Sequence, residues 1–528
     1  MDQTPADRAA AAAAADAAPP ARVRRADGPP AMTIDGRTLT TRNLVARVDA
    51  PLKVRLTPTA RRRAAASHQA ANAAVGLRPV YGRTTGVGAN REVALPATEA
   101  ARYTLGLLRS HATSAGQVRG DIRIRAMLVV RLNQLAAGGS GISMAAIDGL
   151  QAMINADALP PIREHAGIGT GDLTAMATTA LGLLGEAPLT NPLRPISLGI
   201  HDALPFLSSN AATLADAALA VTRLQTLARA GLAVATLTGV AVQANWEAFG
   251  PAVARVTPGL GSRRVCRVVT GLVTEPGQDA PVHDPARIQD PFGMRCLPQV
   301  NGLMLDTLAQ LDRVVGAHLN AAAENPVILA GPAVLGPDPA PVVAHHGGFH
   351  IPAVALGCDS AAISAAQSAS LLQARLAMLV DPAATGLPPF LGDGTPGASG
   401  VMMLEYLAAS AFAELRSAAS PASLGSVSLS RGTEEHASFA SRSAVQVLNA
   451  GDAYATALSC ELLAAVRALR MQEAVTKTGS AAGWVKILDL CTSLGDSAAD
   501  RDLTGDLATA QELLPVLADL VESYEQDR

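Results

Sequence analysis

The chain has 528 residues, of which 49% are apolar, 16% charged and only 3% aromatic, and its formal net charge is −3. This balance excludes a disordered chain and leaves no strongly basic field for binding nucleic acid. Because aromatic residues are so few, the core must be built from Ala, Leu and Val, whose small side chains favour closely packed helices. The length predicts two or three domains, or one domain with a large helical body.

The five cysteines are widely scattered and form no CxxC pair, which predicts buried thiols in a reduced, cytoplasmic compartment. The first 30 residues are rich in Ala, Pro and Arg but lack a basic start and a long apolar centre, so they predict a flexible tail rather than a signal peptide. No stretch combines spanning length with continuous apolarity, and we therefore expect no membrane span.

The segment from Met32 to Leu56 is rich in β-branched residues and interrupted by turn residues. Its Asp35-Gly36 pair lies between flanks in which apolar residues alternate, which predicts a β-hairpin. After Pro58, apolar residues recur at helical spacing in long Ala/Leu-rich segments, which predicts a bundle of antiparallel helices. The predicted helices are Ile122–Ala137, Met144–Ala156, Leu173–Leu184, Thr213–Ala244, Val300–Ala323, Ser360–Leu379, Met402–Ala419, Ser443–Met471 and Gly505–Tyr524.

The sequence thus predicts a mainly α fold in four parts. These are a disordered tail (1–30), a small mixed α/β region (31–205), a central long-helix bundle (206–475) and a C-terminal helical segment (476–528). Gly- or Pro-rich connectors separate the helices, and such loops are where a helical enzyme carries its chemistry. The connectors are Tyr81–Asn90, Ile162–Asp172, Pro276–Gly293, Gly331–Gly348 and Leu387–Gly400.

Two of the connectors that contain several glycines carry candidate site residues. In the first, Tyr81 precedes a Gly/Thr loop that lacks the GxxxxGK[ST] pattern of a phosphate cradle. Tyr81 is either a general base whose pKa is lowered by nearby positive charge or part of a structural turn. In the second, glycines flank Thr170 and allow the backbone to approach itself closely. The alternative is a helix start capped by Asp172.

Three further clusters carry polar groups. Arg295 lies in segment 287–302, which is dense in polar groups. Its guanidinium either binds a substrate carboxylate through two N–H groups or is an ordinary surface charge. The His-rich run 345–350 does not have the HExxH spacing, so we expect no metal site. Segment 430–436 offers acid–base groups, with a solvated turn as the alternative.

Taken together and in order, these segments resemble the aromatic amino acid lyase family over residues 32–469. The most specific part is the stretch 287–302, which is similar to the family's QDPYSxRCxPQVxG signature. The other matching blocks are Ser110-His111, Asn133–Gly141, Glu324–Pro326, Gly386–Leu391, Ser399-Gly400 and Asp202–Asn210.

The resemblance implies a helical homotetramer whose active sites are shared between subunits, and a reaction that eliminates ammonia from an α-amino acid or shifts its amino group. No external cofactor is implied. The family's electrophile is 4-methylideneimidazol-5-one (MIO), which forms autocatalytically from an Ala-Ser-Gly triplet by cyclisation and loss of two waters. The partners expected are a small amino acid or related carboxylate, without nucleic acid or membrane.

By position, the resemblance implies a role for each matched residue. Tyr81 would remove the β-proton, Arg295 would bind the carboxylate with support from Gln289, and Phe349 would line the cofactor pocket. Glu434 would lie near the amine or side chain, and His111 would contact the substrate side chain, as in histidine- or tyrosine-directed members.

Three positions depart from the family pattern. Gly169-Thr170-Gly171 replaces the cofactor triplet, and dehydration of a Thr would leave an extra methyl that shields the electrophilic carbon. Ser208 replaces a family Asn, with Asn210 two residues further on, and Phe292 replaces the signature Tyr. These changes cluster where the electrophile would be made and held, whereas the base and the carboxylate clamp are kept.

The sequence therefore predicts a carbon–nitrogen lyase that uses Tyr81 for β-proton abstraction, followed by elimination or aminomutase chemistry. The alternatives are a MIO-free lyase, cyclase or addition enzyme with a better leaving group, and a non-catalytic binding homologue. A neutral ammonia leaving group needs assistance, and without an electrophile the barrier rises steeply.

Overall fold

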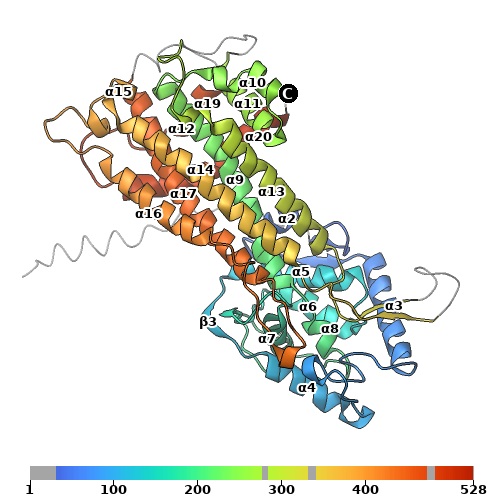
Figure 1. Cartoon of the computed structure of the whole chain (residues 1–528). Coiled ribbons are helices and arrows are strands. Elements are labelled where there is room, and N and C mark those ends of the chain that lie inside the picture. Colours follow the sequence, from blue (N-terminus) through green and yellow to red (C-terminus); the bar gives the residue numbers. More distant parts are fainter. Residues whose placement is uncertain (1–30, 276–283, 331–339, 473–481, 527–528) are drawn as a thin grey trace, which may run out of the picture.

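The computed structural model describes residues 31–275, 284–330, 340–472 and 482–526, and the predicted tail (1–30) lies outside them. Within the described residues the fold is mostly helical, with three two-stranded sheets, which confirms the predicted class (Figure 1). The strands are β1 (Met32–Ile34), β2 (Val54–Leu56), β3 (Ala115–Val118), β4 (Arg163–His165), β5 (Val327–Leu329) and β6 (Val342–Ala344). The four-part division of the chain stays a prediction.

The helices fall into a shorter N-terminal set and a longer set that builds the bundle (Figure 1). The first set is α2 (Thr41–Val45), α3 (Pro58–Val75), α4 (Ala100–His111), α5 (Asp121–Ala137), α6 (Met144–Ala156), α7 (Leu173–Leu183) and α8 (Ala203–Leu207). The second set is α9 (Ala211–Ala241), α10 (Pro251–Val256), α11 (Leu260–Val273), α12 (Phe292–Arg295), α13 (Leu297–Leu319), α14 (Pro352–Val380), α15 (Pro382–Thr385), α16 (Met402–Ala418), α17 (Ala440–Met471), α19 (Gly483–Leu490) and α20 (Thr504–Gln526).

Each helix predicted from periodicity is present, with ends shifted by a few residues in most cases. The largest shift is at α14, which begins at Pro352 rather than near Ser360. Proline is favoured in a first helical turn because its missing N–H would have no partner there. The apolar pattern therefore located the helices, and the turn chemistry set their starts.

The predicted hairpin at Asp35-Gly36 is wrong. β1 pairs in parallel with β2, and Met32 lies opposite Val54. The Asp35 carboxylate accepts the N–H groups of Arg37 and Thr38, which makes a local turn that leads the chain into α2. An Asp-Gly pair is compatible with such a turn as well as with a hairpin. The strand that pairs with β1 is β2, which follows α2 in the sequence.

Alanine-rich helices form the centre of the molecule. The 31-residue α9 lies side by side with α13, α14 and α17, and most of its length is buried (Figure 1). The stretch Ala203–Ala241 is long and apolar enough to span a membrane, but 94% of its apolar window is buried inside the protein. That is the burial of a core helix, whose small side chains let its neighbours approach closely.

A buried ion pair joins three of these helices. Arg375 on α14 donates from Nε and Nη2 to the two carboxylate oxygens of Glu461 on α17, at 2.6 and 2.8 Å, and both side chains are at most 1% exposed. Thr238 on α9 donates to the same carboxylate at 2.8 Å. Arg375 Nη1 also donates to the Gly293 carbonyl at 3.2 Å, which ties α12 to the bundle.

We predict that Arg375→Met lowers the apparent melting temperature strongly, because it leaves the Glu461 charge buried without its partner. Breaking a buried pair from one side costs about 3–5 kcal/mol, whereas replacing both members with apolar residues is often neutral. The double variant R375M/E461M should therefore melt above R375M. A double variant that melts as low as R375M would contradict this account.

Candidate active site

A cavity of about 1340 Å³ opens at the end of the molecule that carries α4, α7 and α8 (Figure 1). The predicted site residues that line it are Tyr81, His111, Thr170, Gly171, Ser208, Phe349 and Glu434. They come from separate loops and helix ends, so the fold brings together residues that lie far apart in the sequence. Gly169, also predicted, is buried directly behind Thr170.

Tyr81 begins a loop that closes over one side of this cavity. Its hydroxyl accepts the N–H of Gly88 at 2.7 Å, which fixes the ring relative to its own glycine-rich loop. Arg91 at the end of that loop donates to Thr433 at 2.9 Å, and Ala89 N–H donates to Ser430 at 3.1 Å. The loop after Tyr81 is therefore anchored to segment 430–436, which supplies Glu434.

The pKa of Tyr81 lies above its ordinary value, chiefly because the side chain is buried. The hydrogen bond from Gly88 N–H opposes this rise, the Glu434 carboxylate adds to it, and the Arg91 guanidinium opposes it. Among the described residues, the positive charge near Tyr81 therefore does not offset its burial, and the raised pKa disfavours the deprotonated form that would act as the base.

The loop that contains the triplet is held by the start of α17. Ser441 Oγ donates to the Gly167 carbonyl at 2.9 Å, and Phe439 N–H donates to the Ile168 carbonyl at 3.0 Å. The Gly169 carbonyl accepts from Ser438 Oγ at 3.0 Å and from His350 Nδ1 at 3.2 Å. Three consecutive carbonyl groups are therefore fixed against one helix end.

The other end of the triplet is held by the start of α9. The Asp172 carboxylate accepts Thr213 N–H at 2.8 Å and Thr213 Oγ1 at 2.9 Å, and Asp172 N–H donates to the Ser209 carbonyl. Burial raises the pKa of Asp172, while these hydrogen bonds and the charge of Arg119 oppose the rise. The alternative that Asp172 caps α7 with its side chain is wrong, since that carboxylate caps α9 instead.

The triplet fits the backbone ring that the family resemblance implies. Gly169 and Gly171 have φ of +84° and +116°, and within the described residues no hydrogen bond occupies the Gly171 N–H. A Cβ on Gly169 would lie 2.3 Å from Ser438 Oγ and 2.7 Å from Phe439 N, so only glycine fills this cradle. Thr170 Oγ1 donates to Glu434 at 3.4 Å, which directs the hydroxyl into the cavity.

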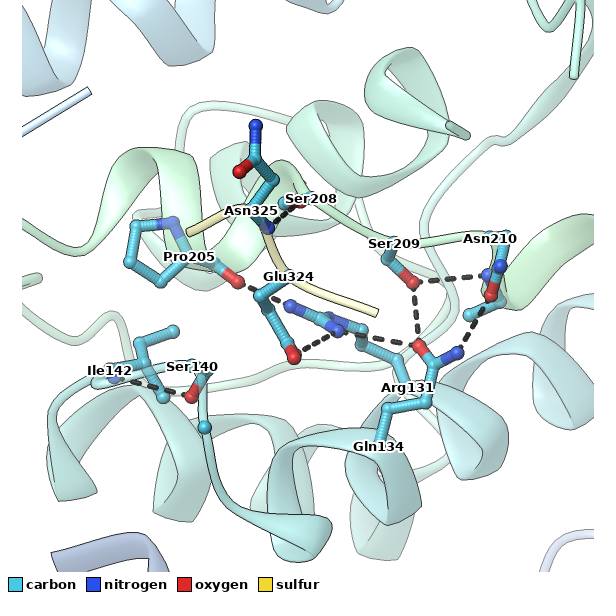
Figure 2. Close-up of polar contacts among 12 residues, drawn as sticks. Arg131, Gln134, Ser140, Ile142, Pro205, Ser208, Ser209, Asn210, Glu324 and Asn325 are labelled. Carbon is cyan, nitrogen blue, oxygen red and sulfur yellow. Dashed lines mark hydrogen bonds and ion pairs between the residues drawn. The ribbon is translucent and has the colours of Figure 1, made fainter. Parts of the chain in front are cut away.

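Asn210 does not take over the position of the family Asn. Its side-chain oxygen accepts from Gln134 at 2.8 Å, and Gln134 in turn accepts from Ser209 Oγ at 2.8 Å (Figure 2). Figure 2 also shows Arg131 beside Gln134, paired with the buried Glu324 at 2.8 Å. Asn210 is thus part of a structural network, while Ser208 lines the cavity and accepts the N–H of Asn325 at 2.9 Å.

Sequence reasoning missed several residues of the cavity wall. His350 and His436 are hydrogen-bonded at 2.9 Å between Nε2 and Nδ1, and both line the cavity. The spacing of the His-rich run bears only on metal binding. It does not predict the hydrogen bond to His436, which lies far away in the sequence. Tyr103 also lines the cavity, and burial raises its pKa to about 12. It lies in none of the sequence motifs described above, so no sequence signal marked it.

Gln289, Phe292 and Arg295 do not join this cavity within one chain. They lie on and just before α12, at the opposite end of the bundle from α4, α7 and α8 (Figure 1). α14 runs from near the cavity to its contact with Gly293, and its rise over that length is roughly 35 Å.

The three residues nevertheless form a group of their own. Arg295 Nη1 donates to Gln289 at 2.7 Å, and its guanidinium carbon lies 4.8 Å from the centre of the Phe292 ring. The side chain of Phe292 is 63% exposed, so this group faces outward from the chain.

We predict that charge changes around Tyr81 move its pKa in opposite directions. Glu434→Gln removes the carboxylate that raises the pKa and should lower it, whereas Arg91→Gln should raise it further. The pKa is measured as the tyrosinate absorbance titration of each protein minus that of the same protein carrying Tyr81→Phe. Shifts of the same sign in both variants would contradict the electrostatic account.

Comparison with known proteins supports the resemblance. The sequence profile of the family described as aromatic amino acid lyase matches residues 39–488. The chain is 31% identical over 519 residues to a probable histidine ammonia-lyase from Halobacterium salinarum, covering 93% of this chain and 97% of that protein. It is 29% identical over 526 residues to histidine ammonia-lyase from Bos taurus, covering 94% and 78%.

The fold agrees as well. The crystal structure of histidine ammonia-lyase from Trypanosoma cruzi superposes with a TM-score of 0.84 at 25% identity, covering 94% of this chain and 96% of that one. These matches confirm the expected fold and the expected enzyme class, a carbon–nitrogen lyase. The chain belongs to the aromatic amino acid lyase family.

Proposed function

We propose that this protein eliminates ammonia from an α-amino acid, with Tyr81 removing the β-proton. The observation that carries the proposal is that Tyr81, Thr170 and Glu434 face one cavity while the Gly169 carbonyl is fixed behind them. Relatives named histidine ammonia-lyase support the reaction class.

An MIO-like group made from Gly169-Thr170-Gly171 would supply the electrophile that binds the substrate amine and makes it a better leaving group. Glu434, which accepts from Thr170 Oγ1, lies where it can take or return a proton at the amine. Phe349 and Ser208 shape the wall beside the triplet. The Thr170 methyl would stay on the electrophilic carbon and slow attack at that carbon.

We further propose that a second subunit completes the site in a homotetramer. In one chain, Tyr81 has a raised pKa and Arg295 lies at the far end of the bundle. Seating Arg295 of a second copy over the cavity would bind the substrate carboxylate bidentately and bring positive charge toward Tyr81. Exposed apolar side chains near Arg295 suit burial between copies, among them Ile288, at 92% exposure, and Phe292.

The substrate side chain is proposed to extend toward His111. The Leu107 carbonyl accepts from His111 Nδ1 at 2.9 Å, so the neutral ring carries its proton on Nδ1 and offers Nε2 as an acceptor. With Tyr103 on the same wall, this suits an aromatic or heteroaromatic side chain that bears a hydrogen-bond donor.

The reaction is tested by incubating the purified protein with each aromatic and heteroaromatic amino acid and measuring ammonia and the α,β-unsaturated acid. We expect release from at least one of them, and Tyr81→Phe should lower that rate by about 100-fold or more, since a general base contributes roughly 10²–10⁴. Tyr406→Phe is the matched control, because Tyr406 on α16 is 62% exposed and does not line the cavity. Unchanged release by Tyr81→Phe would remove Tyr81 from the mechanism, and no release from any substrate would contradict the ammonia-lyase proposal. In that case, loss of a better leaving group from a related carboxylate is the next reaction to measure.

A shared site predicts complementation between inactive variants. Tyr81→Phe and Arg295→Ala should each be inactive alone, yet hybrids refolded from an equal mixture should regain activity. With random association, roughly a quarter of the sites would combine an intact Tyr81 with an intact Arg295 from another subunit. Hybrids isolated through two different tags that remain inactive would show that both residues act within one chain.

A further inference from the structure

We propose that Ser438 and His350 form an oxyanion site that drives closure of a five-membered ring between Gly169 and Gly171. The inference rests on the proposed electrophile from this triplet and assigns residues to its formation. Oriented donors aimed at a developing oxyanion are among the strongest devices for lowering an acyl-transfer barrier.

The two donors converge on a single buried atom, the Gly169 carbonyl oxygen. Ser438, only 2% exposed, donates to it at 3.0 Å and accepts Ala440 N–H at 3.3 Å, which fixes the direction of the hydroxyl proton. His350 Nδ1 lies 3.2 Å from the same oxygen. An ordinary loop carbonyl needs one donor, whereas this one has two whose positions are set by other contacts.

The Gly169 carbonyl and the imidazole of His436 together define which ring nitrogens of the two histidines carry protons. Because a carbonyl only accepts, His350 carries a proton on Nδ1, and its Nε2 in the neutral ring accepts from His436 Nδ1 at 2.9 Å. When charge develops on the Gly169 oxygen, His350 can give its Nδ1 proton to that oxygen and take the Nδ1 proton of His436 at its own Nε2. His436 then takes up a proton at its Nε2 from water in the cavity, and the protons released by the Gly171 and Thr170 nitrogens restore the balance. The pair is therefore a proton relay that ends at the oxygen that must leave.

The glycine at position 169 is what permits this approach. A Cβ would lie 2.3 Å from Ser438 Oγ, 2.7 Å from Phe439 N and 2.8 Å from Ala440 N. Two of these neighbours are backbone atoms of the start of α17 and cannot rotate away. Replacement of the family's Ala by Gly is thus the change that lets the carbonyl sit against its donors.

The chemistry needs no external reagent. The Gly171 nitrogen bonds to the Gly169 carbonyl carbon, and its proton ends on the carbonyl oxygen. That oxygen leaves as water with the proton of the Thr170 N–H, which forms a C=N bond between residues 169 and 170. A second water then takes the Thr170 hydroxyl and its α-proton, forming a C=C bond, so two waters are lost without oxidation or reduction.

The test follows ring closure directly rather than turnover. The full-length chain is synthesised in a cell-free system, and the fraction of a proteolytic peptide spanning residues 167–172 that has lost two waters is measured over time by mass spectrometry. Ser438→Ala and His350→Ala should each slow this loss by about 100-fold, the effect of removing one oxyanion donor. His350→Asn, which places an amide N–H near the position of Nδ1, should recover part of the rate.

Ser441→Ala is the matched control, because Ser441 donates to the same loop at 2.9 Å but to the Gly167 carbonyl, which does not react. Ring closure in Ser438→Ala and His350→Ala at the Ser441→Ala rate would overturn the proposal, as would a wild-type chain that loses no water. If the wild type keeps its full mass yet releases ammonia through Tyr81, only this inference fails. If the ring closes as expected but no amino acid yields ammonia, only the proposed function fails.

Discussion

The chemistry of this protein depends on how the loop 167–172 is fixed between two helix starts. α17 holds the carbonyls of residues 167–169, and α9 holds the Asp172 carboxylate through Thr213. Helix starts expose N–H groups that the helix itself cannot pair, so they bind carbonyl and carboxylate oxygens readily. Both helices are long and buried in the bundle, and this anchors the triplet to the core of the protein. Thr170, at the centre of the loop, is thereby presented to the cavity.

The same architecture is the reason for our proposal that a second copy of the chain completes the site. An Ala-rich core lets the helices pack closely, and it makes a long, narrow bundle in which Tyr81 lies near one end and Arg295 near the other (Figure 1). Burial raises the pKa of Tyr81, and within the part of the chain that the structure describes this rise is opposed by the charge of Arg91, which is also hydrogen-bonded to Thr433. Tyr81 at one end of the bundle and Arg295 at the other end would meet if two bundles packed side by side in an antiparallel arrangement. Ile288 and Phe292 are exposed close to Arg295, and the association that we propose would bury them.

The sequence predicts the long helices well, because Ala and Leu at helical spacing between Gly- and Pro-rich connectors leave little choice of structure. It also predicts that Tyr81, Thr170 and Glu434 share a site, through ordered motifs rather than through spacing alone. It fails at Asp35-Gly36, where a local signal fits two turns, and at Asp172, where any nearby helix start could take the carboxylate. The hydrogen bond between His350 and His436 could not be predicted, since it joins loops whose relative position depends on the whole bundle. A sequence motif also cannot show whether Arg295 acts in the cavity of its own chain or in that of another copy.

Gly169-Thr170-Gly171 departs from Ala-Ser-Gly, and yet we propose that it is held beside Tyr81 as the precursor of an electrophile. The scarcity of aromatic residues makes this site distinctive, since Tyr81, Tyr103 and Phe349 all line the same cavity. The most direct measurement is the intact mass of the purified wild-type protein, with the modified peptide located. The account predicts a chain lighter by two waters, with the loss confined to residues 169–171. An unmodified mass would contradict it.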